Sequence, residues 1–136
     1  LDYETKRLYS ELRFVQAAGR SAKIFLTGFS RNDIETGEDV YLIIWPRENS
    51  YQVFRGTSED KPLREKHYFA NGVTIKFREN STFIRIHFDS AGKWNIHSVN
   101  SSSSKKNTLV LRSRLGKEKY IRFDSVGRIL VGRNND

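Results

Sequence analysis

The chain has 136 residues, of which 37% are hydrophobic and 12% aromatic; this suits one domain with one packed core and is too apolar for a disordered tail. It has no cysteine, which excludes disulfides, thiolate catalysis and cysteine-bound metals, and no apolar stretch approaches the roughly 20 residues of a membrane-spanning helix. The net charge of +8 is concentrated in residues 105–136, which carry nine basic and three acidic side chains. Such a field attracts nucleic acid, anionic lipid or an acidic protein partner, and is also typical of an ordinary solvated surface.

Residues 1–22 are predicted to form a helix. Leu1, Leu8, Leu12 and Val15 fall on one stripe at helical spacing, and most charged residues lie elsewhere. The sequence begins at Leu1, contains no methionine and has no convincing helix start there. We therefore expect the helix to be part of a longer one whose upstream part was removed by processing or truncation.

From residue 23 onward the hydrophobic period changes to two, which is typical of strands. The polar residues that alternate with Val73, Ile75 and Phe77 indicate an antiparallel sheet with one face on a core and the other in water. The fold class is therefore α+β: an N-terminal helix packed on one or more antiparallel sheets, with residues 23–136 forming a β-rich body in a single domain, residues 1–136. Nine strands are predicted: Lys23–Phe29, Asp39–Trp45, Tyr51–Arg55, Val73–Arg78, Thr82–Phe88, Lys93–Val99, Thr108–Leu115, Lys119–Phe123 and Arg128–Val131.

Two similar tetrapeptides join pairs of predicted strands. They begin at Asp89 and Asp124 and each reads Asp-Ser-x-Gly, ending at Gly92 and Gly127. An Asp carboxylate accepts hydrogen bonds from nearby backbone N–H groups, and Gly adopts the positive φ that closes a turn. Aspartic proteases place Gly directly after Ser or Thr, so these segments are predicted to be hairpin turns and not a catalytic pair.

Other catalytic or metal-binding patterns are missing from the sequence. The three histidines lack metal-binding spacing, and His87 is expected to lie opposite Trp94 and away from His97. There is no Gly-x-Ser-x-Gly motif and no glycine-rich phosphate loop. We therefore expect no enzyme activity, no cofactor and no metal, while an unrelated secreted β-rich enzyme stays an alternative.

The last predicted strands form a basic ribbon. With residues 116–118 as the loop, Arg112 is expected opposite Arg122 and Arg114 opposite Tyr120. A basic ribbon that contains tyrosine can follow a phosphate backbone, although an ordinary surface, an acidic subunit contact or a lipid contact stays open. The candidate nucleic-acid-binding residues are the basic side chains of this region: Arg112, Arg114, Lys117, Lys119, Arg122, Arg128 and Arg133.

The helix motif Leu12-x-x-Val15-x-x-Ala18 is predicted to lead into a strand. Four further passages follow along nearly the whole chain: Val40–Ile44 with Tyr51–Val53, Leu63 with Ala70–Phe77, Ile86–Gly92, and Phe123–Val131. This order of features resembles the minor pilins and pseudopilins of type IV filament systems. The most similar groups are the H-type minor pseudopilins of type II secretion, the fimbrial minor pilins and the small competence pseudopilins of Gram-positive bacteria.

The resemblance implies a role and a location. The chain would be a structural minor subunit of a surface filament, with other pilins or pseudopilins as partners and Leu1, Leu8, Leu12 and Val15 as filament-packing residues. The upstream part would be a prepilin leader and an apolar half-helix, cleaved and methylated by a prepilin peptidase. The half-helix would anchor the subunit in the membrane before assembly.

The resemblance also implies an alternative role in DNA uptake. Some minor pilins of this shape bind DNA through a C-terminal Gly-Arg-x-Arg motif. Gly127 and Arg128 match it, Leu130 stands at the second Arg, and Gly132-Arg133 follows just beyond.

Overall fold

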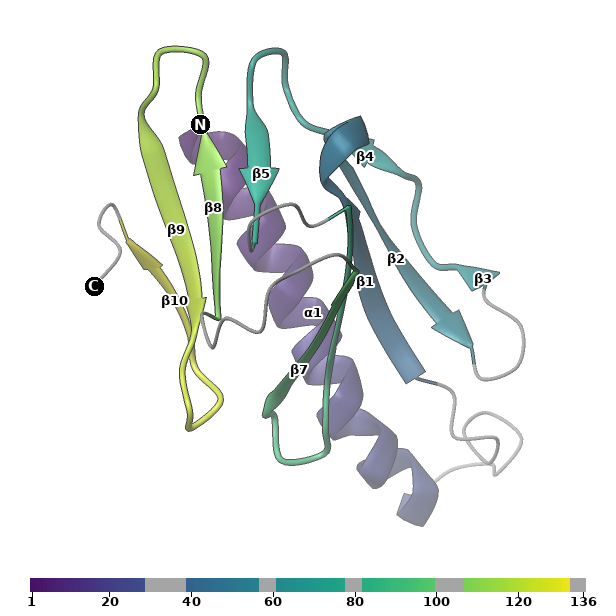
Figure 1. The fold of residues 1–136 in the computed structure, drawn as a ribbon. Helices are drawn as coiled ribbons and strands as arrows, with labels where there is room; N and C mark the ends of the chain where they lie inside the picture. Colours follow the sequence, from purple (N-terminus) through teal and green to yellow (C-terminus); the bar gives the residue numbers. More distant parts are fainter. Residues whose placement is uncertain (29–38, 57–60, 78–81, 100–106, 133–136) are drawn as a thin grey trace.

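A computed structural model describes residues 1–28, 39–56, 61–77, 82–99 and 107–132 (Figure 1). Helix α1 spans Asp2–Gly28, and a short 3-10 helix, η2, spans Pro46–Glu48. Ten strands are found in the described residues: β1 Asp39–Trp45, β2 Ser50–Gly56, β3 Lys61–Pro62, β4 His67–Tyr68, β5 Thr74–Lys76, β6 Phe83–Phe88, β7 Trp94–Val99, β8 Thr108–Arg112, β9 Glu118–Phe123 and β10 Ile129–Gly132.

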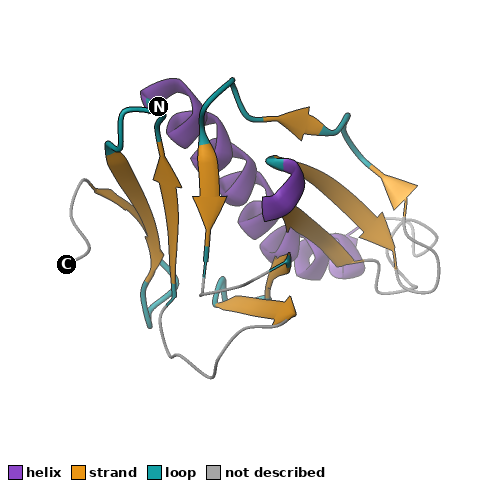
Figure 2. Cartoon of the chain, turned by 45° about the horizontal axis from the view of Figure 1, so that its top comes forward, coloured by secondary structure: helices purple, strands orange, loops and turns teal. Residues whose placement is uncertain are grey.

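The strands form two antiparallel sheets, and helix α1 lies across one face of both (Figure 1). The first sheet has the order β3-β2-β1-β6-β7 with β4 also paired to β2, and the second has the order β10-β9-β8-β5. The chain enters the second sheet with β5, returns to the first with β6 and β7, and leaves it again with β8, so neither sheet is formed from one continuous stretch (Figure 2). The prediction of an α+β fold with an N-terminal helix on antiparallel sheets is confirmed.

The predicted end of the helix is wrong. Helix α1 continues to Gly28, so the described residues of the predicted strand Lys23–Phe29 are helical, and Phe29 lies outside the described residues. Extending an existing helix by one residue needs no new nucleus, and no glycine or proline interrupts residues 20–27. The apolar segment that follows Lys23 therefore remains helical as far as Gly28, and glycine is the residue type most common at such a helix end.

The core lies between the helix and the inner faces of both sheets. Helix α1 contacts β1, β6, β9 and β10, and the contacting stripe is apolar, as the helical period requires. Alternate residues of the strands complete the core, which is why period two predicted the faces of the strands correctly. The largest fully buried aliphatic side chains of this core are Leu8, Leu12, Leu42, Ile44, Ile84, Ile86, Leu109, Leu111 and Ile121.

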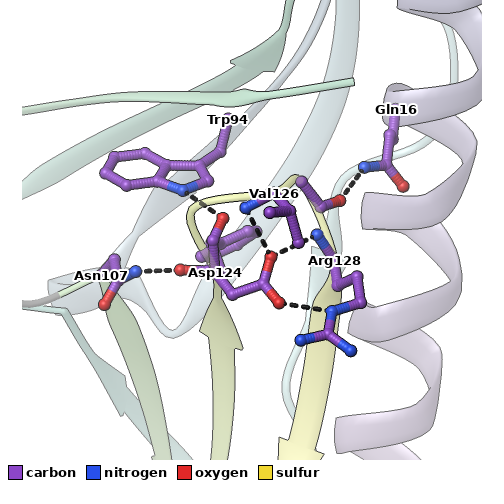
Figure 3. Close-up of polar contacts among 8 residues, drawn as sticks. Gln16, Trp94, Asn107, Asp124, Val126 and Arg128 are labelled. Carbon is purple, nitrogen blue, oxygen red and sulfur yellow. Dashed lines mark hydrogen bonds and ion pairs between the residues drawn. The ribbon is translucent and has the colours of Figure 1, made fainter. Parts of the chain in front are cut away.

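A single helix side chain holds a turn from each sheet. Gln16 is only 4% exposed, and its Nε2 donates to the carbonyl oxygen of Gly92 at 2.9 Å and to that of Gly127 at 2.6 Å. Figure 3 shows the Gln16 side chain pointing at the β9–β10 turn. Gly92 belongs to the β6–β7 turn of the first sheet, and Gly127 to the β9–β10 turn of the second. The Trp94 indole adds a second link between the sheets, since its Nε1 donates to the carbonyl oxygen of Asp124 at 3.1 Å.

These two turns are the two Asp-Ser-x-Gly segments, and their prediction as hairpin turns is confirmed. The Oδ1 of each Asp accepts the N–H groups of the residues two and four positions later, at 2.7 to 3.0 Å. Gly92 and Gly127 have φ of 85° and 90°, a region that glycine enters without strain. A Cβ on Gly127 would lie 2.8 Å from the carbonyl oxygen of Gly92, so the turns touch where Gln16 binds both.

Replacing Gln16 by Leu should destabilise the protein by about 2–4 kcal/mol, because two buried carbonyl oxygens lose their donor and each costs about 1–3 kcal/mol when left unpaired. Chemical denaturation followed by circular dichroism measures this change. Gln52→Leu is the matched control, because Gln52 makes an exposed hydrogen bond to the carbonyl oxygen of Arg64 and should cost less than about 1 kcal/mol. Equal losses in the two variants would contradict a bridging role for Gln16.

Replacing Gly19 by Ala should also destabilise the protein, by about 2 kcal/mol, although Ala favours helices over Gly by about 1 kcal/mol. The added Cβ would lie 2.6 Å from the carbonyl oxygen of Phe88, a backbone atom that cannot move without shifting β6. The exposed Ala17, replaced by Ser, is the control and should stay within about 0.5 kcal/mol of the parent chain. A more stable Gly19→Ala variant would show that the helix does not need this close approach.

Candidate functional site

The outer face of the second sheet contains part of the predicted basic set. Leu109, Leu111 and Ile121 are buried in the core, so the residues that alternate with them point away from it. Strands β5, β8 and β9 lie side by side on this face, and β10 continues it with Leu130 opposite Arg122. The described side chains of this face on β5, β8 and β9 are Thr74, Lys76, Thr108, Val110, Arg112, Glu118, Tyr120 and Arg122.

The register on this face differs from the predicted one. Arg112 lies opposite Glu118, and Arg122 lies opposite Thr108, so the expected pairing of Arg112 with Arg122 and of Arg114 with Tyr120 is wrong. The connection is longer than predicted, because β8 ends at Arg112 and a turn spans residues 113–117. This turn is closed by the N–H of Ser113 bonding to the carbonyl oxygen of Lys117 at 2.8 Å.

The longer turn changes which residues of β8 and β9 lie opposite each other, but it leaves each strand residue on the predicted face of the sheet. It replaces a contact between like charges with the opposite charges of Arg112 and Glu118, a favourable cross-strand pair. The hydroxyl of Tyr120 donates to Glu118 Oε1 at 2.8 Å, and this hydrogen bond raises the pKa of Tyr120, as do burial and the Glu118 charge. Glu118 is the sole carboxylate among the outer-face side chains that the structure describes on β5, β8 and β9.

Lys76 is a member of this face that sequence reasoning missed. Strand β5 pairs with β8, which places Lys76 next to Val110, in the row that continues to Tyr120. Two strands of the other sheet separate β5 from β8 along the chain, so the pairing could not be inferred from sequence order. The signal available was the outward position of Lys76 in the alternating β5 segment. The outer face thus combines Lys76, Arg112 and Arg122 on three neighbouring strands.

Two other predicted cations have carboxylate partners. Lys119 lies on the inner side of β9 and its Nζ is 2.9 Å from Asp2 Oδ1, at the start of the helix. Arg128 Nε is 2.6 Å from Asp124 Oδ2, in the β9–β10 turn (Figure 3). Burial alone would raise the pKa of Asp124, but the Arg128 and Val126 N–H groups and the Arg128 side chain bring it below its ordinary value.

The remaining cations lie near the opposite end of the second sheet. Arg114 and Lys117 belong to the β8–β9 turn and are exposed; Arg114 lies against Gly72, where an added Cβ would come within 3.1 Å of its Nε. Figure 1 shows this turn and the β9–β10 turn of Arg128 at opposite ends of β9. Arg133 lies outside the described residues. The structure therefore separates the predicted set into an outer face and two distant ends.

The predicted filament-packing residues are buried inside the chain itself. Leu8, Leu12 and Val15 are 0% exposed, and Leu1 is partly buried at the edge of the same core. Their prediction as contacts to other subunits is wrong for these three, because one apolar stripe cannot face its own sheets and a partner at once. The helix surface open to a partner is the opposite stripe, with Tyr3 and Phe14 66% and 37% exposed and with Arg7 and Ser10 between them.

The histidines do not form a recognisable metal site. His87 lies opposite Asn95 and not Trp94, and its ring stacks on that of His97 with centroids 6.1 Å apart, so the predicted orientation of His87 is wrong. Nowhere in the described part of the chain do three or more acidic or histidine side chains gather in a way that could hold a metal ion. None of the described helical residues forms a segment long and apolar enough to cross a membrane.

Comparisons with models of protein families, with curated proteins and with solved structures find no match to this chain. The relation to type IV pilin-like subunits is therefore a prediction from the order of motifs along the chain. The architecture agrees with that prediction at the level of one N-terminal helix packed on antiparallel sheets.

Proposed function

We propose that the chain is a structural minor subunit of a type IV pilus-like filament. The observation that carries this proposal is the arrangement of helix α1. Its apolar stripe packs against both antiparallel sheets, and the stripe of Tyr3, Arg7, Ser10 and Phe14 is left exposed. Tyrosine, tryptophan and arginine are the residue types most enriched in the hot spots of protein interfaces. A rod-like helix with this exposed stripe suits lateral packing against other subunits.

The proposal includes a location and partners. Other pilins or pseudopilins of the same filament are the partners, and an apolar helical segment upstream of Leu1 anchors the subunit in the membrane before assembly at the cell surface. The subunit acts through protein contacts and not through catalysis. The gene sequence upstream of Leu1 tests the anchor: a short basic leader ending in glycine and then about 20 apolar residues are expected.

Site-specific cross-linking tests the subunit contact. The chain has no cysteine, so Tyr3→Cys creates a single attachment point for a thiol-reactive photocross-linker. In the producing cell, the full-length protein labelled at this position should form cross-linked species with other filament subunits, identified by mass spectrometry, because Tyr3 lies on the exposed stripe.

Asn95→Cys, on the exposed outer side of β7 and away from helix α1, provides the control and should give a lower yield. Cross-links from Tyr3→Cys that contain no filament subunit, or equal yields at both positions, would contradict the proposed packing face.

A second candidate function is DNA binding by the outer face of the second sheet. The observation that favours it is the presence of Lys76, Arg112 and Arg122 on three neighbouring strands of one face, with Glu118 as the sole carboxylate described there on β5, β8 and β9. Each phosphate that a cation neutralises releases counterions, which gives binding that depends strongly on salt. This role is compatible with the structural one, since the face is separate from the exposed stripe of the helix.

Titration of a fluorescent duplex at two salt concentrations tests the second function. Micromolar or weaker binding is expected, falling steeply between about 50 and 200 mM salt. Arg112→Ala with Arg122→Ala should reduce both the affinity and the salt slope, and Lys76→Ala should lower them further. Lys119→Ala is the control, because Lys119 is paired with Asp2. If binding is absent at low salt, or the double variant behaves like the parent, the DNA-binding role is excluded.

A further inference from the structure

The β8–β9 turn and the start of helix α1 lie at the same end of the molecule (Figure 1). They border one open recess of about 600 Å3, which is lined by Leu1 and Asp2 at the helix start and by Ser113, Leu115 and Lys117 of the turn. None of the preceding proposals uses this end of the molecule.

The backbone of the turn places Arg114 and Leu115 at its tip. The N–H of Gly116 donates to the carbonyl oxygen of Ser113 at 3.0 Å, and the N–H of Ser113 donates to the carbonyl oxygen of Lys117 at 2.8 Å. Gly116 has a φ of 88°, as the glycine of such a tight turn requires. The two Asp-Ser-x-Gly turns have the same hydrogen bonds, so the three turns can be compared position by position.

Leu115 is the most exposed of the large hydrophobic side chains that the structure describes. It is 86% exposed, compared with 68% for Val126, which holds the same position in the β9–β10 turn. Removing a leucine side chain from water is one of the larger favourable contributions that a single residue makes to packing or binding. In the isolated chain this contribution is almost entirely unused.

Two basic side chains of the same turn lie next to Leu115 in the sequence or close to it. Arg114 and Lys117 are both exposed, and neither forms an ion pair with a carboxylate of the described residues. The tip of the turn therefore combines an exposed apolar side chain with two unpaired positive charges.

The acidic residues at this end are matched by other basic residues. Asp2 Oδ1 lies 2.9 Å from Lys119 Nζ, and Glu118 lies opposite Arg112 across the β8–β9 ladder. The positive charges of Arg114 and Lys117 are left over, so these four basic and two acidic residues have a net charge of +2.

We propose that the β8–β9 turn docks on the surface of an anionic lipid bilayer, with Leu115 inserted among the lipids and Arg114 and Lys117 at the head groups. The proposal rests on the proposed function, in which an apolar segment upstream of Leu1 anchors the subunit. The turn lies at the end from which that anchor extends, so it faces the membrane before assembly. Arginine and lysine suit this position, because their stems are apolar while their charged ends reach the lipid phosphates.

The chemistry of the tip favours a bilayer over nucleic acid. A phosphate backbone attracts Arg114 and Lys117, but the Leu115 side chain adds nothing to a phosphate contact and does not stack on a base as an aromatic ring does. A bilayer offers an anionic surface and an apolar interior, and binding to it increases with the buried apolar area and with the attraction to anionic lipids. Lipid binding by the turn therefore depends on Leu115, whereas nucleic-acid binding does not.

Capture of vesicles by many copies of the 136-residue chain tests the proposal. The chain has no cysteine, so Asn95→Cys takes a single biotin and attaches the chain to streptavidin beads. Asn95 lies beside the β6–β7 turn, which touches the β9–β10 turn at the far end of the second sheet, so the β8–β9 turn stays free. Contacts that are weak singly become measurable when many copies bind one vesicle.

The beads should capture fluorescent vesicles of phosphatidylcholine mixed with phosphatidylglycerol, and capture of pure phosphatidylcholine vesicles should be at least about tenfold lower. Leu115→Ser should lower capture of the anionic vesicles about tenfold, because the inserted side chain is lost. Arg114→Gln with Lys117→Gln should lower it about 25-fold, since each basic residue near an anionic surface contributes about a fivefold gain in affinity.

Two matched controls come from turns of the same geometry at the far end. Val126→Ser removes the exposed apolar residue of the β9–β10 turn and should leave capture unchanged. Lys93→Gln, at the position of Lys117 in the β6–β7 turn, is combined with Arg13→Gln in the exposed part of helix α1. This double variant removes two cations away from the β8–β9 turn, so capture should stay within about twofold of the parent chain.

Thermal unfolding of each variant confirms that the fold is intact. An equal loss in either control, equal capture of anionic and neutral vesicles, or capture that does not change in Leu115→Ser would each overturn the proposal. If duplex DNA binding falls in Leu115→Ser as strongly as vesicle capture does, the tip does not distinguish lipid from nucleic acid and the proposal is likewise rejected.

The cross-linking experiment separates this proposal from the filament role. Subunit cross-links from Tyr3→Cys, together with vesicle capture that is independent of Leu115, reject membrane docking and leave the filament role intact. Capture that depends on Leu115, without any subunit cross-link and without an apolar segment encoded upstream of Leu1, supports the lipid contact of the turn and rejects the filament role.

Discussion

The buried amide of Gln16 is the interaction on which the arrangement of the two sheets depends. The described strands of one sheet form no ladder with those of the other, so the helix and a few side chains fix their relative position. One amide nitrogen supplies the donors for a turn of each sheet, in a place where water cannot replace them. Gly19 and Gly127 have no Cβ, which lets the helix approach Phe88 and lets the two turns approach each other at Gly92. Gln16 therefore couples helix α1 to the β6–β7 and β9–β10 turns, so that a shift of one of them strains its hydrogen bonds to the others.

This coupling assigns different tasks to the two sides of the helix. The stripe of Leu8, Leu12 and Val15 is used entirely inside the chain, which is why it is not a packing surface for other subunits. The opposite stripe keeps Tyr3 and Phe14 exposed, with Arg7 between them. The sheets of the chain cover only one side of this amphipathic helix, so a contact between the helix and a partner must use the other side.

The fold also distributes the excess of positive charge. Lys119 and Arg128 serve the structure, the first at the helix start and the second in the turn that Gln16 holds. Arg112 and Arg122 remain on the outer face, where β5 adds Lys76 from a distant part of the sequence. The positive charge on the outer face is thus smaller than the composition of residues 105–136 indicated, and it lies on three neighbouring strands.

The local sequence determined the presence of a helix over residues 1–22, the faces of the strands and the chemistry of both Asp-Ser-x-Gly turns, because these follow from bonds and side-chain spacing within a few residues. Tertiary structure decided which strands are neighbours, where β8 ends and that Gln16 joins the two turns. These depend on contacts between segments far apart in the chain, and alternation gives a face without giving a neighbour. The same limit applies to the outer face: Arg112 and Arg122 were predicted from local pattern, whereas Lys76 became their neighbour only when β5 paired with β8.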